Sequence, residues 1–178
     1  MNIIFKKVEK NEYDAFRKDV KNIFSIAVVE KFGQNDDEEV ICDEEINESL
    51  YNPNAQVYYA YVDEKKVGGV ALEIDDTTHH NSVEILYVYP DCHSKGIGYA
   101  IWRAIEEKYP ETKVWELVTP YFEKRNINFY VNKCGFKIVE FFNEYHDNSF
   151  DEYNDKLKTK DSSYEFKEEF FRFEKIMK

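Results

Sequence analysis

The sequence has 178 residues, of which 43% are hydrophobic and 17% aromatic, so it contains enough apolar material for one domain with its own core. Its formal net charge of −12 argues against nucleic acid or an anionic membrane as the main partner, because both would repel the average surface. Cys42, Cys92 and Cys134 lie far apart without zinc-type spacing, and no apolar segment resembles a signal peptide or membrane span. We therefore expect a cytoplasmic protein with free thiols.

The first third of the chain predicts one strand and two helices. Residues 2–8 form a short β-like run. Between Tyr13 and Phe32 apolar residues recur at helical spacing, and Gly33 follows, which predicts one long helix. Residues 36–51 carry a weaker helical stripe that ends before a proline and predicts a second helix.

Three β-rich runs follow in the middle of the chain. The runs at 56–62 and 66–74 flank a polar turn at 63–65, which predicts a hairpin. Residues 82–90 are almost continuously apolar, which indicates a strand that is buried on both faces.

The second half predicts helices and strands in alternation. Ile97, Ile101 and Ile105 repeat at helical spacing and predict a helix that ends before Pro110. Thr119-Pro120 predicts the start of a further helix that reaches Gly135. The other segments are strands at 113–119 and 136–145, a polar surface excursion at 146–165 and a last strand at 166–178.

This order of elements predicts one mixed α/β (α+β) domain over residues 1–178, with helices on both faces of its sheet. The sequence leaves the pairing order of the strands open.

The stretch VYPDCHSKGIGYAIW, residues 88–102, joins a strand to a helix through a loop with two glycines. Such a junction suits an anion, because the first helical N–H groups lack acceptors and the helix dipole adds partial positive charge. The loop matches neither familiar phosphate motif: Lys95 precedes Gly96 rather than following a glycine, and Ile101 replaces the third glycine of GxGxxG. A helix that merely begins at glycines is an equally good interpretation of these residues.

The stretch resembles the acyl-CoA pyrophosphate loop of the GNAT superfamily of N-acetyltransferases, whose pattern is Val-x-Pro followed by Gln/Arg-x-x-Gly-x-Gly/Ala. The matching positions are Val88, Pro90, Gly96 and Gly98. His93 stands where the superfamily prefers Gln or Arg, and Ser94 where glycine is common. A second stretch, RNINFYVNKCGF at 125–136, resembles the superfamily's asparagine-rich helix and is similar to the polyamine acetyltransferases.

The resemblance implies a GNAT-like fold, with a mixed, mostly antiparallel central sheet of about seven strands and helices on both faces. It also implies transfer of an acetyl group from acetyl-CoA, a cosubstrate, to a primary amine by direct attack on the thioester. His79, His80 and His146 have no ligand spacing with a carboxylate or cysteine, so we expect no metal. The amine must then be neutral, the oxyanion needs hydrogen-bond donors, and the leaving thiolate needs a proton or a hydrogen bond.

Two residues are implied as catalytic by the resemblance. Glu84, on the strand before the glycine loop, is the candidate general base, acting through water. A glutamate paired across strands is the alternative. Tyr130 matches the superfamily's acid or hydrogen-bond donor to sulfur, and a core tyrosine is the alternative.

The resemblance further assigns binding of acetyl-CoA to three groups of residues. Backbone N–H groups of Leu86, Tyr87 and Val88 would receive the thioester carbonyl. The pyrophosphate would be held by His93, Ser94, Lys95, Gly96, Ile97, Gly98 and Tyr99. Asn126, with Lys124 and Arg125, would reach the pantetheine or the adenosine phosphate, although solvated helix charge explains the two cations equally well. Glu123 replaces the superfamily's pantetheine-binding asparagine.

The acceptor is less closely defined. Residues 36–48 contain eight acids and no base, in a region where superfamily members often wall the acceptor site. This favours a cationic small-molecule amine such as a polyamine, or a peptide amine, although a solvated helix face explains the acids equally well. Tyr58, Tyr59 and Tyr61 line a cation site or simply pack. We expect no nucleic-acid or membrane partner and leave a homodimer open. A non-catalytic acyl-CoA-binding or regulatory module is the alternative function.

Overall fold

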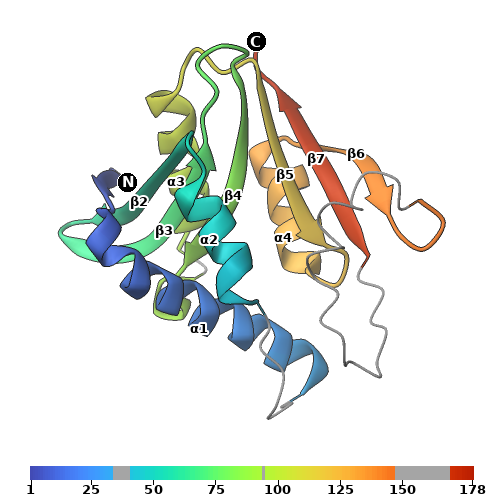
Figure 1. The fold of residues 1–178 in the computed structure, drawn as a ribbon, viewed down its shortest axis with the longest axis horizontal. Coiled ribbons are helices and arrows are strands. Elements are labelled where there is room, and N and C mark those ends of the chain that lie inside the picture. Colours follow the sequence, from blue (N-terminus) through green and yellow to red (C-terminus); the bar gives the residue numbers. More distant parts are fainter. Residues whose placement is uncertain (34–40, 94, 147–168) are drawn as a thin grey trace. The chain divides into compact units, whose positions relative to one another are not determined.

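The computed structural model describes residues 1–33, 41–93, 95–146 and 169–178 (Figure 1). The expected excursion at 146–165 lies outside the described residues, apart from its first residue. The chain comprises two compact units: Met1–Glu116 with Lys175–Lys178, and Leu117–Glu174.

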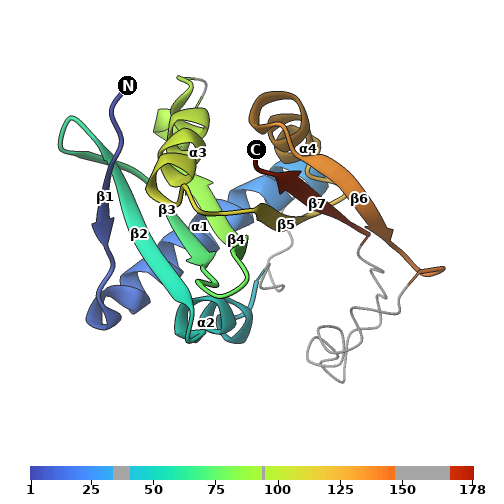
Figure 2. The ribbon, with the colours of Figure 1, turned by 90° about the horizontal axis from the view of Figure 1, so that it is seen from above.

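Seven strands form a mixed sheet, as the resemblance predicted. They are β1 (Ile4–Lys7), β2 (Ala55–Val62), β3 (Lys65–Glu73), β4 (His80–Val88), β5 (Val114–Pro120), β6 (Lys137–Phe142) and β7 (Phe170–Ile176). Their order is β1-β2-β3-β4-β5-β7-β6, with β1 at one edge beside β2 (Figure 2). Antiparallel pairing joins β1 to β2, β2 to β3, β3 to β4 and β6 to β7, whereas β4 and β5 are parallel.

The helices largely follow the predicted periodicities. They are α1 (Tyr13–Phe32), α2 (Asp43–Tyr51), α3 (Ile97–Lys108) and α4 (Lys124–Asn128). α1 has the bounds that its apolar stripe predicted. The first part of the predicted second helix, residues 36–40, lies outside the described residues. None of the helices in the described ranges has both the length and the apolarity needed to span a membrane.

One helix start was predicted wrongly. β5 continues through Pro120, so no helix begins at Thr119-Pro120. A proline lacks the backbone N–H, and the end of a strand tolerates this as well as the first turn of a helix does. The chain then makes a turn in which the Glu123 N–H donates to the Pro120 carbonyl at 3.1 Å, and α4 begins at Lys124.

The first unit buries apolar side chains on one face of its strands beneath α1 and α2. Phe16 and Val20 of α1, with Ile46 and Leu50 of α2, are buried in this core. The strand side chains in the same core alternate along β2, β3 and β4: Val57, Tyr59, Ala71, Ile85 and Tyr87.

The opposite face is covered by α3. Tyr58, which alternates with the core residues of β2, has its hydroxyl 2.9 Å from that of Tyr109 at the end of α3. Ile97, Ile101 and Ile105 of α3 are buried, as their spacing predicted. Helices therefore cover both faces of the strands, which confirms the predicted arrangement.

The second unit has an aromatic core of its own. α4 continues as a wider π-helical turn, Phe129–Cys134, which ends at Gly135 with a φ of 81°. Phe173 of β7 is fully buried, and its ring centroid lies 6.0 Å from that of Tyr130. Arg172 on the same strand pairs with Glu140 of β6 at 2.8 Å.

Two adjacent glycines in β3 allow close packing, and they make a testable prediction about stability. A Cβ on Gly68 would lie 2.2 Å from the backbone oxygen of Tyr87, whereas a Cβ on Gly69 would lie 2.7 Å from the Tyr87 ring and 2.8 Å from Phe16. A ring can shift more easily than a paired backbone. We expect Gly68→Ala to lower the free energy of unfolding by about 1–3 kcal/mol or more, and by more than Gly69→Ala. Urea denaturation checks the order of the two variants, and an equal or reversed order contradicts it.

Candidate active site

The loop between β4 and α3 leads through Gly96 into the first turn of the helix. Gly96 precedes α3 in the left-handed conformation, with φ 75° and ψ 6°. A Cβ at this position would meet no protein atom within 4 Å, so the backbone here faces open space. At the start of α3, the Ala100 N–H donates to the Gly96 carbonyl at 3.0 Å. The N–H groups of Ile97, Gly98 and Tyr99 therefore have no intrahelical acceptor, which is the arrangement that binds anions.

Two side chains that were predicted to hold pyrophosphate contact the backbone of the loop itself. His93 Nε2 lies 2.8 Å from the Val88 carbonyl oxygen, and Lys95 Nζ donates to the Asp91 carbonyl at 2.8 Å. Asp91 also pairs with Lys65 at 2.5 Å. These contacts join the two side chains to the backbone of the loop. Ser94 lies outside the described residues.

The β4 backbone directs alternate N–H groups to opposite sides of the strand. The Tyr89 N–H donates to the Val67 carbonyl at 3.0 Å, on the β3 side. Because successive N–H groups in a strand point in opposite directions, those of Leu86 and Val88 point away from β3, and that of Tyr87 points toward it. Of the three predicted donors, Leu86 and Val88 are thus the ones directed to the other side of β4.

Glu84 is the extra residue of a β-bulge. Ile85 pairs with Ala71 and Val83 with Leu72, so Glu84 has no partner on β3. Bulges often re-aim a side chain beside an active site. The Glu84 carboxylate stays in contact with solvent and accepts a hydrogen bond from the Ser82 hydroxyl. Desolvation by the surrounding protein raises the pKa of Glu84. A raised pKa suits the role of proton acceptor better than that of a carboxylate in a permanent ion pair.

The second unit contains Tyr130 and Asn126, the other predicted site residues. Asn126 is exposed on α4, whereas Tyr130 is 7% exposed at the start of the π-helical turn. The Tyr130 ring packs at centroid distances of 5.1 Å from Phe129 and 5.7 Å from Phe136. Burial, followed by the charges of Cys134 and Glu123, raises the pKa of Tyr130, so its hydroxyl stays protonated at neutral pH. Lys124 lies over the Tyr121 ring, 3.0 Å from its centroid.

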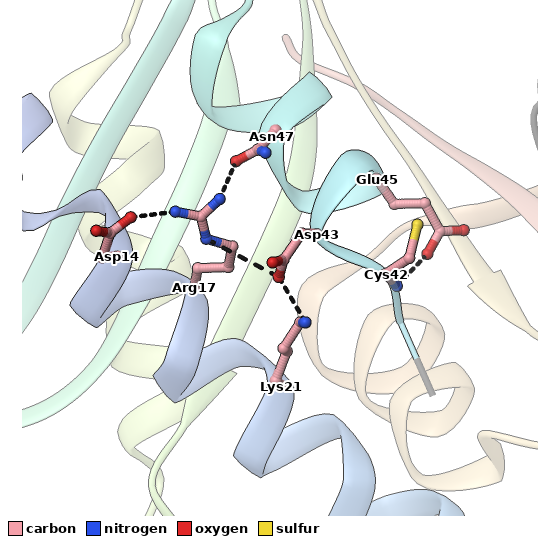
Figure 3. A network of polar contacts seen from close by, with 7 residues as sticks. All are labelled: Asp14, Arg17, Lys21, Cys42, Asp43, Glu45 and Asn47. Carbon is pink, nitrogen blue, oxygen red and sulfur yellow. Dashed lines mark hydrogen bonds and ion pairs between the residues drawn. The ribbon is translucent and has the colours of Figure 1, made fainter. Parts of the chain in front are cut away.

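Part of the acidic segment at residues 36–48 makes polar contacts between α2 and α1 (Figure 3). Lys21 Nζ pairs with Asp43 at 2.5 Å, and Arg17 donates to Asn47 at 2.8 Å (Figure 3). The hydrogen bond from Lys21 lowers the pKa of Asp43. Glu45 accepts the Cys42 N–H at 2.9 Å at the start of α2. At least two of the eight acids therefore stabilise the local structure, while residues 36–40 lie outside the described residues.

Each of the three strand tyrosines proposed as a cation site already contacts a lysine of the chain. Lys66 Nζ lies 4.1 Å from the ring centroid of Tyr59. The corresponding distances are 4.2 Å from Lys6 to Tyr61 and 5.0 Å from Lys108 to Tyr58. In this structure the cations over these rings are therefore lysines of the chain itself.

Sequence reasoning missed a polar cluster between α1 and the strands. Asp19 of α1 pairs with Lys66 at 3.1 Å and accepts a hydrogen bond from the hydroxyl of Tyr89, just before the glycine loop. Burial opposes the charge of Lys66, but bonds with Tyr89 and Asp19 outweigh it and raise the pKa of the ammonium. Burial raises the pKa of Tyr59 to about 12. No local pattern signals this cluster, because its members lie far apart in the sequence, on α1, β2, β3 and the loop after β4.

Cys42, Cys92 and Cys134 are free thiols, as the sequence predicted. Among the residues with described positions, no group of histidine, cysteine and acidic side chains has the arrangement of a metal site.

Comparison with known proteins agrees with this fold and loop. The Acetyltransferase (GNAT) family model matches residues 17–136. The matched segment includes the glycine loop, Glu84 and Tyr130. The chain belongs to the GNAT acetyltransferase family.

A curated relative and two solved structures resemble the chain over nearly its whole length. The uncharacterized protein YrkN of Bacillus subtilis is 47% identical over 176 residues, which cover 99% of this chain and 94% of YrkN. A GNAT acetyltransferase from Elizabethkingia anophelis with acetyl-CoA bound has a TM-score of 0.63 at 15% identity, covering 99% of both chains. Spermidine N-acetyltransferase from Vibrio cholerae, in complex with CoA and spermine, has a TM-score of 0.62 at 13% identity, covering 98% of this chain and 95% of its own.

Proposed function

We propose that the chain transfers an acetyl group from acetyl-CoA to a primary amine, and that the acceptor is a small cationic amine such as a polyamine. The observation that carries the proposal is the first turn of α3, where three N–H groups without intrahelical acceptors follow the left-handed Gly96, a residue on which a Cβ would meet no protein atom within 4 Å. Family membership supports acetyl-CoA as the anion, and the Elizabethkingia structure has acetyl-CoA bound.

In the proposed reaction, the amine nitrogen attacks the thioester carbonyl carbon, so a C–N bond forms as the C–S bond breaks. The N–H groups of Leu86 and Val88 stabilise the oxyanion, because they point away from β3. Bringing an alkylamine of pKa near 10.4 to its neutral form at pH 7 costs about 4.6 kcal/mol. Glu84 accepts this proton, directly or through one water, and its raised pKa makes it a better acceptor than an ordinary carboxylate.

Tyr130 serves the leaving thiolate in this proposal. A phenol has an ordinary pKa about 1.5 units above that of a thiol, so full proton transfer to sulfur is already unfavourable. Burial raises the pKa of Tyr130 further and keeps the hydroxyl protonated. Its main contribution is therefore a hydrogen bond to the departing sulfur, and the thiolate takes its proton from solvent afterwards.

A thiol-release assay tests the proposal. The purified chain is given acetyl-CoA with a monoamine, a diamine, a polyamine and a peptide with a free N-terminus. We expect amine-dependent release of CoA, fastest with the amines that carry a second positive charge. Binding of acetyl-CoA without release of CoA for any amine would identify the chain as a non-catalytic acyl-CoA-binding module. If CoA is released fastest with the peptide, the acceptor is a peptide amine rather than a small cationic amine.

A further inference from the structure

A row of polar side chains crosses three strands of the first unit beside Glu84. Ser82 on β4 is the register partner of Glu73 on β3 and of Glu116 on β5. Register partners on neighbouring strands point to the same face of a sheet. Glu73 follows the core residue Ala71 by two positions, so this is the face that α1 and α2 cover.

The bulge in β4 brings Glu84 onto the same face. Val83 pairs with Leu72 and Ile85 with Ala71. Because Glu84 is an extra residue between them, Ile85 points to the same face as Ser82. The hydrogen bond from the Ser82 hydroxyl to Glu84 Oε1 places the carboxylate there as well. A bond to one carboxylate oxygen limits rotation of the group and leaves Oε2 to receive a proton.

We propose that Ser82 is a positioning residue for the general base, holding Glu84 Oε1 so that Oε2 faces the acceptor amine or its water, while Glu73 and Glu116 adjust the base from either side. This inference rests on the proposed function and assigns three further residues to the same site.

The charges around Glu84 act on it in opposite directions. Desolvation raises the pKa of Glu84 most, and the Ser82 hydrogen bond lowers it because it favours the ionised form. Glu73 and Glu116 are the charged groups that act on Glu84 from β3 and β5, and both raise its pKa by repulsion. Loss of the Ser82 hydroxyl should therefore raise the proton affinity of Glu84, and loss of either neighbouring charge should lower it.

The direction in which the pKa of Glu84 changes in Ser82→Ala distinguishes a positioning role of Ser82 from a purely structural one. If Ser82→Ala only loosened the strand, more water would reach Glu84, and the pKa of Glu84 would fall. If the hydroxyl stabilises the carboxylate, the pKa rises in the same variant. Ser82→Thr keeps a hydroxyl in a strand that favours β-branched residues and is the matched control.

The experiment has two readouts on the same variants. The first is a ¹³C NMR titration of the Glu84 carboxyl in the full chain without substrate, with the signal assigned by its absence in Glu84→Gln. We expect the midpoint to move to higher pH in Ser82→Ala, to lower pH in Glu73→Gln and Glu116→Gln, and to return toward the wild-type value in Ser82→Thr. The second is the pH profile of kcat/KM, whose acidic limb should move in the same directions and disappear in Glu84→Gln.

The two readouts keep the failure of this inference distinct from failure of the proposed function. If no amine is acetylated, the proposed function fails, whereas the NMR titration still reports on Ser82. If Glu84→Gln removes the acidic limb but Ser82→Ala leaves the midpoint unchanged or lowers it, the positioning role of Ser82 is wrong and the base assignment stands. Equal midpoints in wild type, Glu73→Gln and Glu116→Gln would overturn the role of the two flanking glutamates.

Discussion

The Tyr130→Phe variant is expected to lower kcat about 100-fold or more while it binds acetyl-CoA with nearly wild-type affinity. The substitution removes only the hydroxyl, so the ring keeps its packing against Phe129, Phe136 and Phe173 and the second unit keeps its core. The lost hydrogen bond to sulfur forms only as the thiolate leaves, and an interaction made only in the transition state lowers kcat rather than binding. Steady-state kinetics together with calorimetry of acetyl-CoA binding measure the two effects separately.

Tyr121→Phe is the matched control for this prediction. It removes a hydroxyl from another aromatic cluster of the second unit, where the Tyr121 ring lies 5.4 Å from Phe171. We expect it to retain the wild-type rate. A full rate in Tyr130→Phe would show that Tyr130 is a core residue only, and an equal loss in both variants would point to a general effect on the unit.

The Gly96→Ala variant is expected to weaken binding of CoA tenfold or more, which corresponds to about 1.4 kcal/mol or more. Gly96 has a φ of 75°, and a Cβ there would meet no protein atom within 4 Å, next to the first turn of α3. In the proposed complex the added methyl group would crowd the pyrophosphate beside this turn, and the left-handed backbone would add a strain of about 1–2 kcal/mol. Calorimetric titration with CoA measures the loss.

Gly33→Ala controls for the strain in this experiment. Gly33 has a φ of 83°, and a Cβ on it also meets no protein atom within 4 Å, but it lies at the end of α1. We expect both variants to be destabilised and only Gly96→Ala to lose CoA affinity. If the two variants bind CoA equally well, the loop does not hold the pyrophosphate through its backbone.

Most helices and strands could be predicted because their signals are local. The stripe from Tyr13 to Phe32 and the spacing of Ile97, Ile101 and Ile105 depend only on neighbouring positions of one element. Thr119-Pro120 misled because proline suits a strand end and a helix start alike. The position of β7 between β5 and β6 depends on pairing between distant segments, which no local pattern specifies.

In the candidate site, too, features that depend on a local motif could be predicted, and features that depend on distant contacts could not. Gly96 and the first turn of α3 follow from a short motif, and so their geometry agrees with the sequence. The inward contacts of His93 and Lys95 were not predictable, because they depend on where the Val88 and Asp91 carbonyls lie in the folded loop. The bulge at Glu84 exists only in relation to β3, so the sequence could propose Glu84 as a base but could not reveal Ser82 as its partner.

The proposed function requires that the backbone at the start of α3 binds the pyrophosphate of acetyl-CoA. Amide NMR of the ¹⁵N-labelled chain tests it most directly, with CoA added to one sample and pantetheine, which lacks the pyrophosphate, to another. We expect CoA to shift the amide signals of Gly96, Ile97, Gly98 and Tyr99 strongly and pantetheine to leave them almost unchanged. Saturating CoA that leaves these four signals in place, or pantetheine that moves them equally, would contradict it.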